Sequence, residues 1–329
     1  MARIVAAFGS SHSAMQMATL DNWLERFDHI DRKAPIYDFD GNARGYDELL
    51  AARPPEAAKL LSTSEIARRF ADTEAAMDRM KEEIAGARLN ALIVVGDDQK
   101  EIFKDASRPA IAVYYGETIR NGVAPKDIPS DNWYARAQAR RMEEGREAHY
   151  PCHAALGRHL IEGLNARGFD LTAVQSLVDG QHEGHAYSFI HKRYLAGAML
   201  PMVPIFLNTY YPPNQPTPKR CFELGRAIGA LVASFPDDIR VGVLASGGLS
   251  HFLVNERLDA RVMQALRDKD AAFLTSLDPK LLQSGTSEIR NWICALGACP
   301  DLAVSWMTYV PAYRSSALTG VGLCFASWR

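Results

Sequence analysis

Three groups of reactive side chains follow short apolar runs in this sequence: His12, the tripeptide Asp97-Asp98-Gln99, and His251. Imidazoles and carboxylates are the side chains that proteins use to bind divalent metals and to transfer protons near neutral pH. If the apolar runs are parallel strands of one sheet, their carboxyl ends open on a common crevice, where α/β proteins bind ligands. The spacing therefore predicts that the three groups share one site.

The runs that must position these groups alternate with segments of helical periodicity. Strands are predicted at Arg3–Phe8, Ala91–Val95, Ala110–Tyr114, Met202–Leu207 and Arg240–Ala245. Helices are predicted at Ser64–Ala85, Tyr134–Tyr150, Leu156–Leu164, Lys219–Phe235, Leu258–Leu277 and Thr286–Leu296. Alternation of this kind predicts an α/β fold. We expect a single compact domain over residues 1–329, with a mostly parallel central sheet flanked by helices and a helical insertion at about 20–88, after the first strand.

The amino-acid composition argues against two classes of binding partner, nucleic acids and membranes. The 329 residues include 37 Lys and Arg against 39 Asp and Glu, a formal net charge of -2. Such a balance provides no basic surface for nucleic acid or for an anionic membrane. No apolar stretch reaches the roughly 20 residues of a membrane helix. The five cysteines are scattered and form no metal-binding or disulfide pattern, so we expect a cytoplasmic protein with reduced thiols and a small-molecule partner.

Two further segments carry candidate ligands. The loop Asp179–His185 holds His182, Glu183 and His185, but Gly180 and Gly184 favour a loop over the helix that an H-x-x-H zinc site needs. Glu288 lies near the start of a predicted helix, where a carboxylate ordinarily interacts with the helix dipole.

Several motifs resemble one known family, the class III extradiol ring-cleaving dioxygenases of the protocatechuate 4,5-dioxygenase type. The motifs are SHS at 11–13, NTYYPPNQPTPKRC at 208–221, SGGLSHF at 246–252, GTSEIRNW at 285–292 and YVPAYRSSALTGVGLCFASW at 309–328. Within that family they are most similar to the 3-O-methylgallate dioxygenase branch. The resemblance covers essentially the whole chain.

The resemblance implies an Fe(II) ion held by two histidines and one carboxylate, with open positions for a catechol and for O2. His12 matches the first histidine ligand and Glu288 the carboxylate. His251, in the GG-x-SH motif, matches the acid/base histidine, a role that suits an imidazole because it titrates near working pH. His185 of GHAYSF matches a second pocket histidine, which would hydrogen-bond substrate or oxygen; Gly184 stands where the family has an acid.

This sequence departs from the family at the other histidine ligand. The family has that ligand in a D-H-x-x-x-F motif after the second strand, and here the corresponding column holds Asp98, followed by Gln99. Either Asp98 or Gln99 replaces the histidine, or the metal is held weakly or is absent. An anionic oxygen binds a divalent ion better than a neutral amide, which favours Asp98. A site with two carboxylates is also more tolerant of Mn(II).

The implied substrate is a methoxylated or carboxylated catechol from lignin breakdown, such as a gallate derivative, or a dihydroxypyridine. Arginine binds carboxylates through two hydrogen bonds, so Arg290 and Arg314, with Tyr309 and Tyr313, are candidates to hold the ring substituents; Gln99 is a further candidate contact. Relatives commonly assemble, and we expect a homodimer. Two other classes stay open: a metal-dependent hydrolase, and a catalytically silent binding protein on the same fold.

Overall fold

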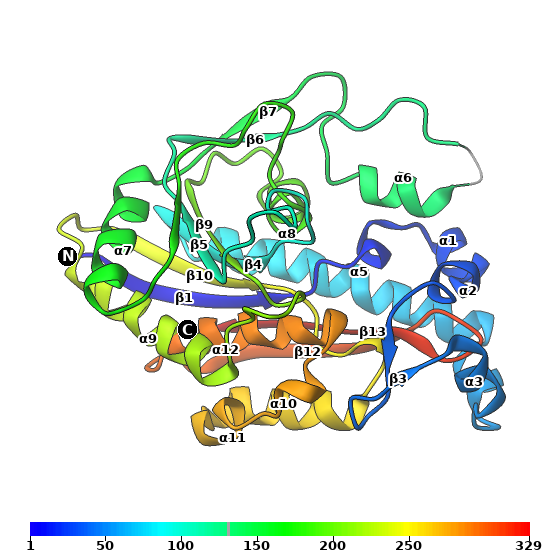
Figure 1. The fold of residues 1–329 in the computed structure, drawn as a ribbon. Helices are drawn as coiled ribbons and strands as arrows, with labels where there is room; N and C mark the ends of the chain where they lie inside the picture. Colours follow the sequence, from blue (N-terminus) through cyan, green and yellow to red (C-terminus); the bar gives the residue numbers. More distant parts are fainter. Residues whose placement is uncertain (130–131) are drawn as a thin grey trace.

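The computed structural model describes residues 1–129 and 132–329, and in these residues nine strands form one central sheet (Figure 1). The strands are β1 (Arg3–Ser10), β4 (Ala91–Asp97), β5 (Ile111–Tyr114), β8 (Thr172–Val174), β9 (Met202–Leu207), β10 (Arg240–Ser246), β11 (His251–Leu253), β12 (Val304–Tyr313) and β13 (Thr319–Trp328). Their order is β11-β13-β1-β10-β4-β9-β5-β8, and β12 pairs with β13.

The middle of the sheet is parallel. β1, β10, β4 and β9 run in one direction, with Ser10 opposite Ser246 and Asp97 opposite Leu207. β13 joins β1 antiparallel and β9 pairs antiparallel with β5, so reversed strands flank the parallel core. The carboxyl ends of the four parallel strands therefore lie at one edge, as the sequence predicted for the candidate site.

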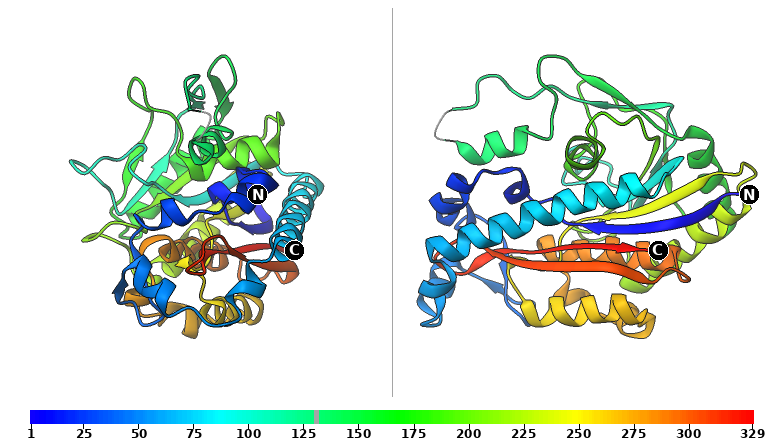
Figure 2. Two further views of the ribbon diagram at one scale, coloured as in Figure 1. Left: turned by 90° about the vertical axis from the view of Figure 1, so that its right-hand side faces the viewer. Right: turned by 180° about the vertical axis from the view of Figure 1, so that it is seen from behind.

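Helices cover both faces of this sheet (Figure 2). Alternate residues of β4 belong to two separate hydrophobic cores: Ile93 and Val95 pack in one, Leu92 and Val94 in the other. The first core includes α7 (Ala154–Ala166), α9 (Pro218–Ser234), α10 (Glu256–Asp268), α11 (Ala271–Thr275) and α12 (Ile289–Ala298). The second includes α5 (Thr63–Gly86), α6 (Trp133–Ala139), α8 (His185–Phe189) and the π-helical turn η2 (Ile190–Leu195). Burial on both faces explains why these strands are continuously apolar.

The chain between β1 and β4 forms the expected insertion, which is mainly helical. Its short elements are η1 (Ala14–Met17), α1 (Leu20–Glu25), α2 (Asp28–Asp31), β2 (Ile36–Tyr37), β3 (Ala43–Arg44), α3 (Tyr46–Ala51) and α4 (Ala57–Leu60), followed by the long α5. The remaining short elements are β6 (Thr118–Asn121), β7 (Ala148–Pro151), η3 (Pro279–Leu281) and η4 (Ser284–Glu288).

The fold class is confirmed, and the five predicted strands are present within two residues of their predicted ends. The helix predicted at Tyr134–Tyr150 is wrong in its second half, because α6 ends at Ala139 and residues 148–151 pair with β6 as β7. The segment predicted as one helix at Leu258–Leu277 is two, since Lys269 takes a left-handed conformation with φ 55° that ends α10. In the described part of the chain, no helix combines the length and the apolar character needed to cross a bilayer.

Candidate active site

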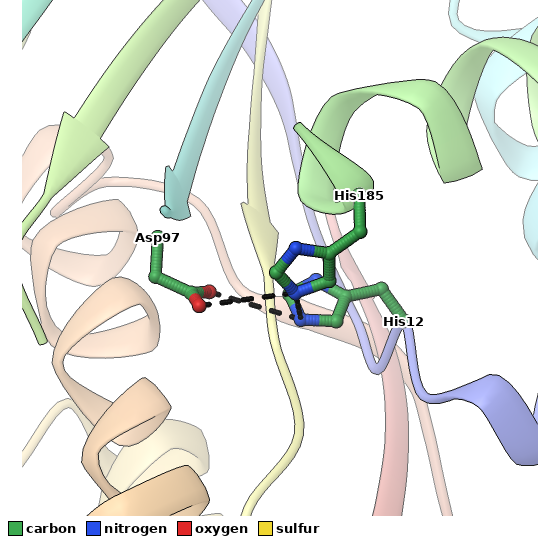
Figure 3. Close-up of side chains that lie close together, drawn as sticks. All are labelled: His12, Asp97 and His185. Carbon is green, nitrogen blue, oxygen red and sulfur yellow. Dashed lines mark hydrogen bonds and ion pairs between the residues drawn. The ribbon is translucent and has the colours of Figure 1, made fainter. Parts of the chain in front are cut away.

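Two histidines and one aspartate converge at the carboxyl edge of the sheet (Figure 3). His12 follows β1, Asp97 ends β4 and His185 begins α8, and their potential ligand atoms all lie within 4.8 Å of one another. The Nε2 atoms of the two histidines are 3.1 Å apart. Asp97 places Oδ1 3.7 Å from Nε2 of His12 and Oδ2 3.8 Å from Nε2 of His185.

Glu288 adds a second buried carboxylate to this group. It ends η4, and its Oε2 lies 3.6 Å from Nε2 of His12. The backbone N–H of Gly248 donates to Oε2 at 2.6 Å, and the hydroxyl of Tyr210 donates to Oε1 at 3.0 Å. These two donors fix the carboxylate with Oε2 turned toward the histidines.

The hydrogen bonds define how the two imidazoles are protonated. Ser246 donates its hydroxyl proton to the carbonyl of Ala186, so its oxygen accepts the Nδ1–H of His12 at 2.9 Å. The carboxylate of Glu101 accepts the Nδ1–H of His185 at 2.7 Å. In the neutral form of each ring the lone pair is then on Nε2. Two lone pairs that face each other at 3.1 Å need a cation beside them, either a proton or a metal.

The group fits a divalent metal in its geometry and donor chemistry. Neighbouring ligands of an octahedral ion with bonds of about 2.1 Å lie about 3 Å apart, close to the separations observed here. Oδ1 of Asp97 is buried and accepts no hydrogen bond within the described residues, as expected for an oxygen whose partner is a cation. Imidazoles combined with carboxylates suit Fe(II) and Mn(II).

Burial and mutual charge shift the pKa values of the acids in opposite directions. Burial and the negative charge of Glu288 raise the pKa of Asp97. Burial alone would also raise the pKa of Glu288, but the nearby His251 and His12 outweigh it and hold that pKa low. Burial would lower the pKa of His185, but the charge of Glu101 outweighs it and raises this pKa to about 9.

Asp98, the predicted ligand, lies outside this group. Its Oδ1 accepts the backbone N–H of Ile102 at 2.8 Å, and its Oδ2 accepts those of Lys100 and Phe103, both at 3.1 Å. The carboxylate therefore caps the turn after β4. Adjacent residues of a strand point to opposite faces, so Asp97 and Asp98 cannot both face the histidines. The structure brings Asp97 to the site in place of Asp98.

His251 lies beside the candidate metal-binding group of His12, Asp97, His185 and Glu288 rather than in it. Its Nδ1 donates to the carbonyl of Leu249 at 3.0 Å, which leaves the lone pair on Nε2, 3.9 Å from Oε2 of Glu288. Burial lowers the pKa of His251, so the ring is a neutral base at pH 7. A Cβ at Gly285 would lie 2.4 Å from the side chain of His251, so this ring occupies space that any larger residue at 285 would take.

A cavity of about 230 Å³ opens onto these groups. It is lined by His12, Ser13, Ala14, Gln99, Glu101, Tyr134, Gln138, Arg141, His185, Tyr210, His251, Phe252, Glu288 and Arg314. A cavity of about 150 Å³ accommodates benzene. The volume is therefore suited to one aromatic ring with small substituents.

Two predicted substrate contacts line the cavity. Nε and Nη2 of Arg314 donate hydrogen bonds to the carboxylate of Asp31 at 2.9 and 2.7 Å, which leaves Nη1 to donate to another acceptor. Its guanidinium stacks against Phe27 and Phe252. The amide nitrogen of Gln99 is within 3.4 Å of both Nε2 of His185 and Oδ2 of Asp97, so it borders the candidate metal-binding group.

The other predicted contacts lie elsewhere. Tyr309 donates its hydroxyl to Asp259 at 2.6 Å, and Tyr313 donates to Glu256. Arg290 is buried and donates to backbone carbonyls, including that of Pro216 at 2.9 Å. None of the three lines the cavity, so the structure does not bring them to the candidate site.

The loop before His185 supplies no second metal group among the described residues. Nδ1 of His182 lies 2.9 Å from the carbonyl of Glu183, and the carboxylate of Glu183 pairs with His191 at 2.8 Å. Of the four ionisable residues from 179 to 185, only His185 reaches the cavity.

Sequence reasoning assigned no role to four residues of the site: Asp97, Glu101, Tyr210 and Arg141. Asp97 was within the predicted tripeptide, and the alternation of β4 favours it once the strand is extended to its observed end. Tyr210 lies in a quoted motif but without an assigned role. Glu101 follows a predicted strand and Arg141 lies within the helix predicted at Tyr134–Tyr150, and no periodicity distinguishes either from solvent-exposed side chains.

Comparison with known proteins defines the class. The family model for the catalytic LigB subunit of aromatic ring-opening dioxygenases matches residues 78–325, well over half of the chain. The chain therefore belongs to this family of aromatic ring-opening dioxygenases, which confirms the resemblance that the motifs predicted. The match includes Asp97, His185, His251 and Glu288 and begins after His12.

Among individual relatives, the gallate dioxygenase of Pseudomonas putida is 32% identical over 113 residues. The match covers 32% of this chain and 30% of that enzyme. This chain thus aligns with less than a third of the relative's length.

Proposed function

We propose that this protein is a non-haem Fe(II)-dependent extradiol dioxygenase, which opens a catechol-type ring with O2 beside its two hydroxyl groups. One observation carries the proposal: two imidazole lone pairs and two buried carboxylates converge beneath a cavity sized for one aromatic ring. Membership of a ring-opening dioxygenase family supports the reaction class.

The proposed metal ligands are His12, His185, Asp97 and Glu288. This set replaces the missing histidine after the second strand with His185 from α8, and it uses Asp97 instead of Asp98. Fe(II) held by these residues would supply activation of O2 and of the catechol. Mn(II) is a second candidate because two carboxylates make the site harder.

His251 is the proposed proton carrier. Its neutral Nε2 lines the cavity and is free to take a catechol proton, since its other nitrogen is bound to the carbonyl of Leu249. Nη1 of Arg314 is placed to donate a hydrogen bond to an anionic or methoxy substituent of the ring. A gallate-type catechol fits these contacts, and the similarity to a gallate dioxygenase favours it. A dihydroxypyridine is the alternative ring.

The decisive experiment is anaerobic loading with Fe(II), followed by measurement of O2 uptake with a panel of catechols, gallate and 3-O-methylgallate included. We expect O2 consumption and a ring-fission product whose mass and NMR spectrum show cleavage next to the hydroxyl carbons. Cleavage between those carbons, or hydrolysis without O2 uptake, would exclude the extradiol proposal. An inability to retain Fe(II) would favour a silent binding protein.

Two variants assign the roles of the histidines. His12→Ala should lose the metal, whereas His251→Phe should keep it and lower turnover by roughly 10²–10⁴-fold, the range for a general acid/base. His149→Phe is the matched control, because this side chain is 55% exposed on β7, outside the cavity. Near-normal turnover of His251→Phe would reject its role as proton carrier.

A further inference from the structure

Glu101 makes two hydrogen bonds to the same residue, His185. Its Oε1 accepts the backbone N–H of His185 at 2.9 Å, and its Oε2 accepts the ring Nδ1–H at 2.7 Å. Glu101 belongs to the turn after β4, whereas His185 begins α8, 84 residues later. The two contacts therefore tie the ring of His185 to the carboxyl edge of the sheet.

This double contact determines which nitrogen of His185 faces the site. An ionised carboxylate only accepts hydrogen bonds, so Nδ1 must carry the hydrogen. In the neutral or metal-bound ring the lone pair is then on Nε2, which lies 3.1 Å from Nε2 of His12. Because the backbone N–H is bound by the same carboxylate, the ring cannot turn over without losing one of the two contacts.

Gly184 provides independent support for this arrangement. A Cβ at this position would lie 2.7 Å from Oε2 of Glu101. The backbone of Gly184 has φ -69° and ψ 168°, which any L-residue adopts, so conformation does not require glycine here. The residue is small because the carboxylate of Glu101 occupies the space beside its Cα.

Arg141 forms an ion pair with the same carboxylate. Its Nη2 lies 3.3 Å from Oε1 of Glu101, and its Nε donates to Gln138 at 3.3 Å. The side chain of Arg141 lines the cavity and is 15% exposed. The contacts thus run from the cavity wall through Glu101 to His185.

We propose that Glu101 is a positioning residue that fixes the tautomer and the ring orientation of His185, so that Nε2 is presented to the metal. The inference rests on the metal site of the proposed function and deepens it. Glu101 touches neither metal nor substrate in this role. Carboxylates that orient a ligating histidine typically contribute 10–100-fold to metal affinity.

Three variants test the proposal. Glu101→Gln removes the carboxylate, because a glutamine cannot accept from both N–H groups when one of its two ends is a donor. Gly184→Ala leaves Glu101 in the sequence but displaces its carboxylate. Gly45→Ala is the matched control, since Gly45 also precedes a helix with an extended backbone, φ -79°, and has no atom within 4 Å of an added Cβ.

Two measurements separate this inference from the proposed function. The first is the 15N NMR spectrum of the histidines in metal-free protein, with the signals of His185 assigned by comparison with His185→Gln. Recorded at about pH 10, above the pKa of about 9 of His185, it reports the tautomer of the neutral ring without any metal. The second is the dissociation constant for Mn(II), measured by the EPR signal of the free ion.

In the parent protein at this pH we expect the neutral ring of His185 to carry its hydrogen on Nδ1. Glu101→Gln and Gly184→Ala should both shift the ring toward the Nε2–H tautomer and weaken Mn(II) binding by roughly 10–100-fold. Gly45→Ala should change neither. An unchanged tautomer and an affinity within twofold in either folded variant would overturn the role of Glu101. A parent protein that has the Nδ1–H tautomer but binds no metal would overturn the proposed metal site. The shift of tautomer in the two variants would still support the contact between Glu101 and His185.

Discussion

At this site the hydrogen-bond partners of a side chain decide its role as much as its residue type does. Asp97 and Asp98 are identical in type and adjacent in sequence, yet one has an unbound oxygen beside two histidines and the other caps three backbone amides. A buried carboxylate oxygen without a hydrogen-bond donor, rather than the residue type, therefore distinguishes the candidate ligand Asp97 from Asp98.

Tyr210 offers a test at this scale. Its hydroxyl donates to Oε1 of Glu288, which is buried, while Tyr210 itself is half-buried. Tyr210→Phe leaves that oxygen without this donor, which should lower the free energy of unfolding of the metal-free protein by about 1–3 kcal/mol. Urea denaturation at pH 7 measures the change.

Tyr211→Phe is the control for this substitution. The neighbouring tyrosine contacts Arg108 and Lys100 through the face of its ring, which phenylalanine preserves. Equal unfolding midpoints for the two variants would show that the bond from Tyr210 to Glu288 contributes nothing measurable.

At the scale of elements, the sequence predicted the strands better than the turns after them. Runs such as Ala91–Val95 are apolar on both faces, so their ends, and the polar groups that follow, are visible in the sequence. The hydrogen-bond partners of residues in those turns are not visible in the sequence. Glu101, for example, binds His185, and the strands β5 to β8 lie between the two along the chain. β12 and β13 also escaped prediction, since their residues pair only with each other and with distant strands.

The turn that carries His251 depends on a helix outside the site. Asp259 of α10 accepts the N–H of Ser250 at 3.0 Å and the hydroxyls of Ser250 and Tyr309, both at 2.6 Å. Tyr309, expected to contact substrate, thus supports the turn beside His251. Burial outweighs these hydrogen bonds and raises the pKa of Asp259 to about 6.

This raised pKa predicts a pH dependence of stability. A carboxyl group with a higher pKa in the folded state contributes stability below its unfolded value of 3.8, and that contribution is lost as the pH rises through about 6. Asp259→Asn removes the titration and keeps a similar shape. The stability of the parent relative to this variant should therefore fall by roughly 3 kcal/mol between about pH 4 and pH 7, since one pKa unit corresponds to about 1.4 kcal/mol.

Urea denaturation across that pH range checks the prediction. Asp268→Asn, on the exposed end of the same helix, provides the control and should show no such difference. A parent that gains stability relative to Asp259→Asn as the pH rises would reverse the sign and exclude a buried, protonated Asp259.

On the scale of the whole molecule, the proposed ligands come from four places along the chain. His12 follows β1, Asp97 ends β4, His185 begins α8 and Glu288 ends η4, so the group forms only when the central sheet and its covering helices are assembled. The unfolded chain offers no such arrangement. A metal that binds here must therefore bind the folded state far more tightly. Association into a dimer stays a prediction, which light scattering checks.

Metal binding should consequently stabilise the entire fold by mass action. At a free Mn(II) concentration 100 times its dissociation constant, the free energy of unfolding should rise by about 2.7 kcal/mol, and chelation should reverse the gain. His12→Ala should remove the gain because it deletes one ligand, whereas His149→Ala, an exposed histidine on β7, should retain it. Urea denaturation of the three proteins with and without Mn(II) measures the effect. Equal stabilisation of His12→Ala would mean that the ion binds elsewhere, and the convergence of these four elements would then need another explanation.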